Sequence, residues 1–172
     1  MGNTVFIVGG ARSGKSTFAL ELGSKISGRK GFIATAETLD EEMKERIIFH
    51  KKTRPAEWET IEEPVDLGKR LQNIAGSYDV VIVDCLTLWL SNMLGRGGDS
   101  EHIKTATGHL TSILNDLSYK VIIVSNEVGL GIVPDNKIAR LFRDLGGLMN
   151  QKVASVADEV YLVTCGIPMR IK

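Results

Sequence analysis

The chain alternates short runs of β-branched and other apolar residues with longer segments in which apolar positions recur every three or four residues. The short runs are typical of strands, and the longer segments are typical of helices with one buried face. Because two of the runs, Val80–Val83 and Val121–Val124, contain no polar residue, we expect helices to cover both faces of those strands. The pattern therefore predicts an α/β domain with a mostly parallel central sheet flanked by helices. The other clear strands are Thr4–Val8, Gly31–Ala34 and Val160–Val163.

Four further segments add to the predicted order of elements, beside a short helix with Leu88, Trp89 and Leu90 and a longer polar helix after the loop Gly95–Ser100. Glu57–Ile61 is a weaker strand, and Ile167–Ile171, which follows Gly166, indicates a short antiparallel edge at the C-terminal end of the sheet. Apolar spacing predicts one long helix over Asp135–Ala157, and a second helix over Asp40–Lys52 that ends before Pro55.

Length and composition narrow the function classes. The 172 residues suit one domain, which we take as residues 1–172, and 21 Lys and Arg balance 21 Asp and Glu. This balance argues against a strongly basic nucleic-acid binder, so we expect no nucleic-acid partner. No apolar stretch approaches the ~20 residues of a membrane span, and Met1–Thr4 lacks the basic start of a secretory signal. We therefore expect a cytoplasmic protein whose two cysteines, Cys85 and Cys165, are buried thiols.

A phosphate-binding motif stands directly after the first predicted strand. The motif G-x-x-x-x-G-K-[ST] is matched by Gly9, Gly10, Ala11, Arg12, Ser13, Gly14, Lys15 and Ser16. Glycines let the backbone turn its N–H groups toward phosphates, and the helix that follows adds a favourable dipole. We expect Lys15 to contact the outer phosphates and Ser16 to bind Mg²⁺. Asp84, which closes an apolar strand, is the second expected metal contact, and the alternative for Asp84 is a helix cap.

The phosphate loop by itself indicates only that a nucleotide binds, so a kinase, another transferase, a motor and a switch all remain open. Glu127, at a strand end, and Arg140 or Arg143, on the long helix, are weaker candidates for substrate or phosphate contacts. Strand-end capping and an ordinary charged helix face explain these three residues equally well.

One histidine lies on the inward face of a predicted helix. His50 follows Met43 and Ile47 at helical spacing, and Arg46 lies one turn before it. Lys51, Lys52 and Arg54 follow, and such a cluster of cations would hold phosphate oxygens near the imidazole. A lone histidine of this kind is often a structural residue. The alternative hypothesis is that neutral His50 attacks a nucleotide phosphorus and forms a covalent intermediate.

Six segments in the same order resemble the bifunctional adenosylcobinamide kinase and adenosylcobinamide-phosphate guanylyltransferase family of cobalamin biosynthesis. They extend over nearly the whole chain and are therefore more specific than a phosphate loop alone. The segments are Gly9–Ser16, Ala34–Ala36, His50–Trp58, Asp84–Thr87, Ser125–Pro134 and Arg140–Gln151. Where some members carry a second histidine just before the reactive one, this chain has Phe49, which leaves His50 as the covalent residue.

The resemblance implies a RecA-like P-loop fold, Mg²⁺ dependence and two reactions. A nucleoside triphosphate, ATP or GTP, phosphorylates adenosylcobinamide, and GMP is then transferred from GTP to that phosphate through a guanylylated His50. The resemblance also implies a homotrimer. The GTP contacts that it implies are Gly9 to Ser16, Ala34, Thr35, Ala36, Lys51, Lys52, Thr53, Arg54, Glu62 and Asp84.

Two other functions compete with this one. A simple small-molecule P-loop kinase would transfer only the γ-phosphate and would not use His50. A RecA-type switch module would couple nucleotide hydrolysis to a change in conformation. Neither alternative explains the His50 segment or the later motifs.

Overall fold

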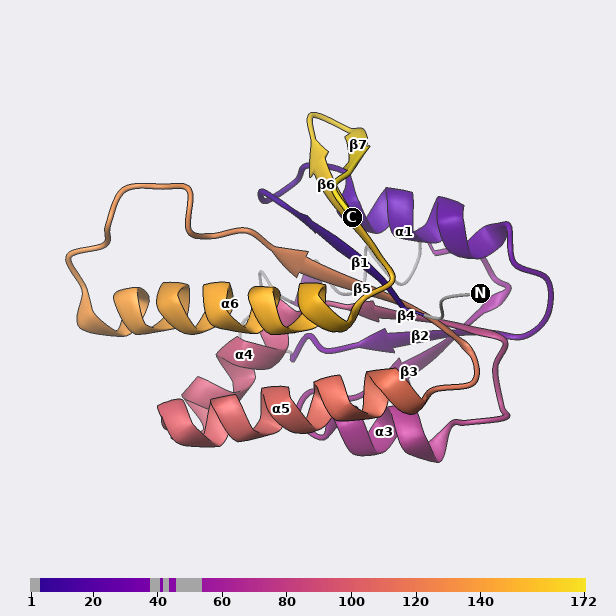
Figure 1. The fold of residues 1–172 in the computed structure, drawn as a ribbon, viewed down its shortest axis with the longest axis horizontal. Coiled ribbons are helices and arrows are strands. Elements are labelled where there is room, and N and C mark those ends of the chain that lie inside the picture. Colours follow the sequence, from indigo (N-terminus) through magenta and orange to yellow (C-terminus); the bar gives the residue numbers. More distant parts are fainter. Residues whose placement is uncertain (1–3, 38–40, 42–43, 46–53) are drawn as a thin grey trace.

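The structure, a computed structural model, describes residues 4–37, 41, 44, 45 and 54–172 and has one seven-stranded sheet at its centre (Figure 1). The strand order is β3-β2-β4-β5-β1-β6-β7, in which β1 to β6 are parallel and β7 runs antiparallel to β6. The strands are β1 (Thr4–Gly9), β2 (Lys30–Ala34), β3 (Trp58–Glu62), β4 (Val80–Asp84), β5 (Lys120–Asn126), β6 (Glu159–Thr164) and β7 (Ile167–Arg170).

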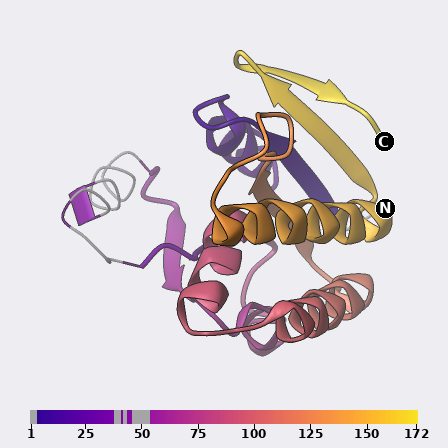
Figure 2. The ribbon, with the colours of Figure 1, turned by 90° about the vertical axis from the view of Figure 1, so that its left-hand side faces the viewer.

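Helices cover both faces of the sheet, as the apolar strands predicted (Figures 1 and 2). Helix α1 lies on one face, and α3, α4, α5 and α6 lie on the opposite face. None of the helices in the described ranges is long and apolar enough to cross a membrane. The helices are α1 (Lys15–Ser24), α3 (Leu67–Asn73), α4 (Leu86–Gly95), α5 (Ser100–Asp116) and α6 (Lys137–Val156).

Strand alternation divides the core into two apolar clusters. On β4, Val81 and Val83 belong to the cluster under α3 to α6, whereas Val80 and Ile82 belong to the cluster under α1. All four side chains are 0% exposed, since both faces of β4 are covered. The carboxyl ends of the parallel strands lie side by side, and the phosphate-loop motif follows β1 there. Below, this side is called the carboxyl edge of the sheet, as distinct from the outer strands β3 and β7.

The predicted strands and the antiparallel edge are confirmed, but the long helix begins later than expected. Helix α6 starts at Lys137 because the side chain of Asn136 accepts hydrogen bonds from the N–H groups of Ile138 and Ala139, at 2.8 and 3.2 Å. The local cap therefore decides the helix start, which apolar spacing had put at Asp135. The helix predicted over Asp40–Lys52 lies mainly outside the described residues.

The expectation of two buried thiols is correct for Cys85 and wrong for Cys165. Cys85 follows β4 inside the domain, and burial raises the pKa of its thiol to about 12. Cys165 is exposed because it forms the tight turn between β6 and β7 with a left-handed backbone, φ 53°. Apolar neighbours in sequence do not bury a residue that lies at the tip of a hairpin.

We expect Gly23→Ala to lower the free energy of unfolding by about 1–3 kcal/mol, the usual cost of overpacking a core. A Cβ at Gly23 would lie 2.5 Å from a ring carbon of the buried Trp58. The matched control is Gly108→Ala on α5, where a Cβ meets nothing within 4 Å. That control should gain up to about 1 kcal/mol from helix propensity. Urea unfolding measures both, and equal stability of the two variants would contradict tight packing at Gly23.

Candidate functional site

The side chain of Lys15 lies across the phosphate loop and donates hydrogen bonds to two of the loop residues. The ammonium of Lys15 donates to the carbonyl of Gly10 at 2.6 Å and to the hydroxyl of Ser13 at 3.5 Å. Lys15 is only 6% exposed although it carries a charge. Phosphate oxygens in the loop would offer the same ammonium stronger, charge-assisted acceptors.

Two glycines of this loop are required by close approach. A Cβ at Gly9 would lie 2.3 Å from the carbonyl oxygen of Val163 on β6. Gly14 has φ +100°, and its Cβ would lie 3.2 Å from the Cα of Gly166. The N–H of Gly166 also donates to the carbonyl of Ser13 at 2.9 Å. The β6–β7 turn thus supports the loop from outside.

Helix α1 begins directly after the loop, at Lys15. Its N-cap residue is Gly14, and no side chain caps the first turn. Uncapped N–H groups and the helix dipole together favour an anion at this end. Ser16, half-buried in the first turn, lies at the position expected for the metal contact.

Asp84 ends β4 beside the lysine. Burial lowers the pKa of the Lys15 ammonium, and the charges of Cys85 and Asp84 oppose that shift. Because the thiol of Cys85 has a pKa of about 12, it is neutral near pH 7, and Asp84 is the anion that favours a charged Lys15. Helix α4 has Cys85 as its N-cap residue, so Asp84 does not cap it.

The residues at this edge suit Mg²⁺ bound together with a nucleotide. Ser16 and Asp84 carry the oxygen atoms that this hard cation prefers as ligands, and such a cation usually completes its coordination with substrate phosphates and water. In the described part of the chain no group of three or more His, Cys, Asp and Glu side chains could hold a metal by itself.

Strand register places two further predicted contacts, Ala34 and Glu62, at the same edge. Ala34 at the end of β2 pairs with Glu62 on one side and with Asp84 on the other. Thr35 is fully buried, and its hydroxyl donates to the carbonyl of Cys85 at 2.7 Å and accepts from the N–H of Cys85 at 2.8 Å. Thr35 thus holds the chain that follows Asp84, and direct contact of its side chain with GTP stays a prediction.

Arg54 lies against Phe32 of β2, on the face of the sheet that α1 covers. Its guanidinium lies 3.5 Å from the centroid of the Phe32 ring, a cation–π geometry, and donates to the hydroxyl of Thr60. Burial lowers the pKa of Arg54, and the charge of Asp84 opposes this shift, so these two charges act on each other. His50, Lys51, Lys52 and Thr53 lie outside the described residues.

Two buried polar side chains that hold the end of β5 were not among the site residues predicted from the sequence. The hydroxyl of Thr87 on α4 accepts from the N–H of Asn126 at 2.7 Å. The amide of Asn150 on α6 donates to the carbonyl of Asn126 at 3.1 Å. Polar residues within apolar helix faces are the signal that could have identified both. They fix the end of β5, where the N–H of Glu127 donates to the carbonyl of Gly9 at 2.9 Å.

The two arginines proposed as weaker phosphate contacts have local partners. Arg140 donates to the carbonyls of Pro134 and Asp135 at 3.0 and 2.6 Å and so ties the loop before α6 to the helix. Arg143 forms an ion pair with Asp144 at 3.1 Å. Among the described residues, neither guanidinium has a hydrogen bond or an ion pair with Lys15 or Asp84.

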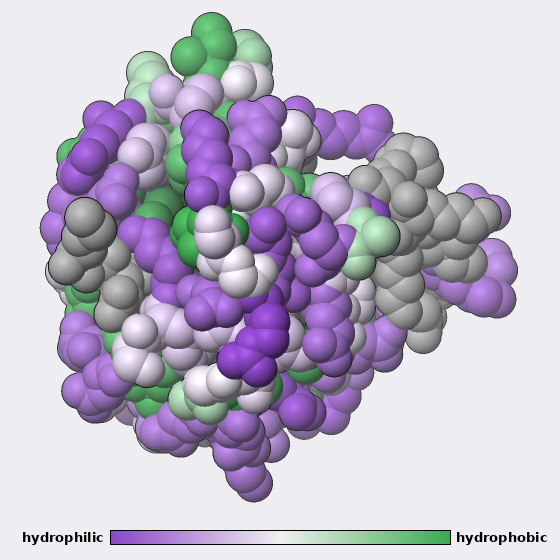
Figure 3. All heavy atoms as spheres, turned by 90° about the vertical axis from the view of Figure 1, so that its right-hand side faces the viewer, coloured by the Kyte–Doolittle hydropathy of each residue, from purple (hydrophilic) through white to green (hydrophobic). Residues whose placement is uncertain are grey.

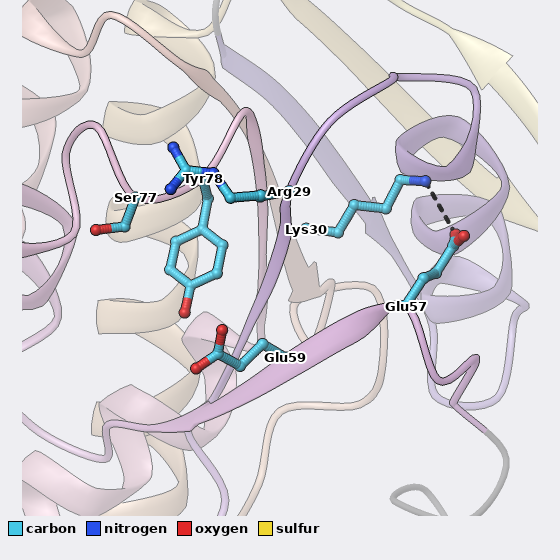
Figure 4. A pocket seen from close by; sticks show the side chains of 6 residues that line it. All are labelled: Arg29, Lys30, Glu57, Glu59, Ser77 and Tyr78. Carbon is cyan, nitrogen blue, oxygen red and sulfur yellow. Dashed lines mark hydrogen bonds and ion pairs between the residues drawn. The ribbon is translucent and has the colours of Figure 1, made fainter.

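A polar cavity of about 420 Å³ lies near the amino ends of β2 and β3, at the other end of these strands from the phosphate loop (Figure 4). Lys30 forms an ion pair there with Glu57 at 3.0 Å, and burial and a hydrogen bond to Glu59 raise the pKa of Tyr78. Figure 3 shows that this side of the molecule is mostly hydrophilic. Because its charges neutralise each other and it lies far along the strands from the phosphate loop, we assign no chemistry to it.

The comparisons with known proteins agree with the geometry. The cobinamide kinase / cobinamide phosphate guanyltransferase family matches residues 5–171. The bifunctional adenosylcobalamin biosynthesis protein CobP of Pseudomonas aeruginosa is 40% identical over 166 residues, which are 96% of this chain and 95% of that protein. The corresponding protein CobU of Escherichia coli K12 is 37% identical over 180 residues, 98% of this chain and 99% of that protein.

A solved structure confirms the fold at low identity. The ATPase EscN of the enteropathogenic Escherichia coli type III secretion system matches with a TM-score of 0.59 and 14% identity. The match covers 95% of this chain and 43% of that one, and what the two share is the RecA-like P-loop fold. With its fold, its phosphate loop and near full-length relatives in agreement, the chain belongs to the cobinamide kinase / cobinamide phosphate guanyltransferase family, whose members are transferases.

Proposed function

We propose that this protein phosphorylates adenosylcobinamide with ATP or GTP and then transfers GMP from GTP to the resulting phosphate through a guanylylated His50. The observation that carries this proposal is the phosphate loop, closed by the buried Lys15 and placed beside Asp84 at one sheet edge. Family membership supplies the acceptor and the order of the two reactions.

The two reactions take place at different phosphorus atoms of a nucleoside triphosphate bound at one site. Phosphorylation takes place at the γ-phosphorus, with a nucleoside diphosphate leaving, whereas guanylylation takes place at the α-phosphorus, with pyrophosphate leaving. Charge develops on the outer phosphates in both cases, so the same cations stabilise both leaving groups. We therefore assign Lys15 to both steps, with Ser16 and Asp84 as the residues that would hold Mg²⁺. The metal would neutralise phosphate charge when it is bound.

In the transfer step a nitrogen of the neutral His50 imidazole would form a bond to the α-phosphorus as the bond to the bridging oxygen breaks and pyrophosphate leaves. An oxygen of cobinamide phosphate would then displace the histidine from that phosphorus. The position of Arg54 supports this assignment because it lies four residues after His50 and shares electrostatic interaction with Asp84. Lys51, Lys52 and Thr53 are assigned to the same triphosphate by resemblance alone.

A homotrimer and a cytoplasmic location belong to the same proposal. The edge strand β7 and the residue after it support association of copies. Ile167 and Met169 on β7 and Ile171 directly after it alternate along the chain and are 65%, 47% and 61% exposed. Exposed apolar side chains on an edge strand are unusual for an isolated domain. The location rests on the sequence-based expectation.

We expect wild-type protein incubated with Mg²⁺ and GTP labelled at the α-phosphate to retain acid-labile label after denaturation, because a phosphorus–nitrogen bond survives that step. The His50→Ala variant should retain none, and GTP labelled at the γ-phosphate should label neither protein. The matched control is His102→Ala, an exposed histidine on α5, which should label like wild type. Label on the His50 variant would contradict the covalent role, and a simple kinase would show no label at all.

We expect Lys15→Ala to lower the rates of both half-reactions by about 100-fold or more, the usual effect of removing one charge-stabilising group. Assays of adenosylcobinamide phosphorylation and of GMP transfer to preformed adenosylcobinamide phosphate measure the two steps separately. Lys25→Ala at the exposed end of α1 is the control and should leave both rates unchanged. If the Lys15 variant kept either activity intact, the two steps would not share this site.

A further inference from the structure

Glu127 is held against the phosphate loop through its backbone. Its N–H donates to the carbonyl of Gly9, the first residue of the loop, at 2.9 Å. The preceding residue, Asn126, is fixed from two helices by Thr87 and Asn150, at 2.7 and 3.1 Å. Contacts from β1, α4 and α6 therefore determine the position of the Glu127 backbone. In Figures 1 and 2 the chain leaves β5 at this point beside the end of β1.

The carboxylate of Glu127 is oriented but not neutralised. One oxygen, Oε1, accepts from the N–H of Gly129 at 2.7 Å, and the side chain is half-buried. A Cβ at Gly129 would lie 2.9 Å from that oxygen, so the two residues fit closely. Within the described ranges no cation pairs with Glu127, and its second oxygen, Oε2, has no recorded partner.

The other carboxylates near this edge differ in this respect. Asp84 interacts with Lys15 and is the expected metal ligand. Glu37 forms an ion pair with Arg96 at 2.5 Å, and Glu63 forms one with Arg70 at 3.2 Å. Glu62 ends β3, which is separated from β1 by β2, β4 and β5, whereas Glu127 follows β5, the direct neighbour of β1. Among the carboxylates that the structure describes, Glu127 is therefore the one best placed to act beside the loop.

The two reactions differ in their need for a base. The acceptor of the kinase step is a hydroxyl, which must lose its proton as it forms a bond to phosphorus. The acceptor of the transfer step is a phosphate, which is already an anion near neutral pH. A residue that only accepts a proton will therefore serve the first reaction and not the second.

We propose that Glu127 is the general base of the kinase step, an assignment that rests on the proposed function. The acceptor oxygen forms its bond to the γ-phosphorus while the bond from that phosphorus to the β–γ bridging oxygen breaks. The electron pair leaves with the nucleoside diphosphate, and the hydroxyl proton moves to Oε2 of Glu127. Oε1 stays bonded to the N–H of Gly129 and keeps the carboxylate in position.

The loop beyond Glu127 supports an acceptor on this side of the site. Leu130 and Ile132 are 87% and 95% exposed although both are large apolar side chains. A corrinoid acceptor has a large macrocycle with apolar faces, and these exposed side chains, which begin three residues after Glu127, offer such a surface an apolar contact.

The test is Glu127→Gln, since the amide oxygen of glutamine still accepts from the N–H of Gly129 but cannot take a proton. We expect kcat for adenosylcobinamide phosphorylation to fall about 100-fold or more, a typical contribution of a general base, with KM for the nucleotide little changed. GMP transfer from GTP to preformed adenosylcobinamide phosphate should stay within about threefold of wild type, well short of that contribution. Glu101→Gln, an exposed position on α5, is the matched control and should change neither reaction.

Two results would overturn the assignment. Phosphorylation at the wild-type rate in Glu127→Gln would exclude a proton-accepting role, and an equal loss of both reactions would show that Glu127 only maintains the site. If the wild-type protein performed neither reaction, the proposed function would fail, and this assignment would fail with it. Selective loss of phosphorylation in a variant that still transfers GMP is the result that supports the proposal.

Discussion

The parallel pairing of β1 with β5 on one side and β6 on the other is the constraint on which the site depends. Gly9 pairs with Asn126 and with Val163, so the phosphate loop leaves the sheet between two fixed strand ends. Only a glycine fits at position 9, where a Cβ would lie 2.3 Å from a backbone oxygen. The close approach of these three strands determines where the loop begins, and the closely packed sheet resists a change in that geometry.

Buried polar contacts hold the strand ends against the helices behind them. The hydroxyl of Thr35 satisfies both backbone groups of Cys85, and the amide of Asn92 donates to the carbonyls of Thr35 and Pro64 at 2.7 and 3.0 Å. Each such bond matters more here than at the surface, because a buried backbone group without a partner costs roughly 1–3 kcal/mol. The side chains that hold the strand ends in this way are Thr35, Thr87, Asn92 and Asn150. Among them, only Asn150 has a buried side-chain oxygen, Oδ1, with no hydrogen-bond partner among the described residues.

Charge is concentrated at the site although the chain as a whole is neutral, with 21 basic and 21 acidic residues. Lys15 and Arg54 both lose solvation by burial, and Asp84 opposes the resulting shift in the pKa of each. A partly desolvated cation binds phosphate more strongly than one in water, because the local dielectric constant is lower. A neutral protein can therefore bind a highly charged nucleotide without a basic surface.

The sequence alone was sufficient for the strands, the phosphate loop and the family, because these depend on local patterns: apolar runs, glycine spacing and motif order. It did not place Cys165 on the surface, because the hairpin tip forms only where β7 pairs with β6. Apolar spacing also did not give the start of α6 at Lys137, which the local cap by Asn136 sets. The tertiary structure alone decided that Thr87 and Asn150, from two helices, would fix the chain before Glu127. Contacts between residues far apart in sequence leave no periodic signal, and only the packed sheet and helices bring them together.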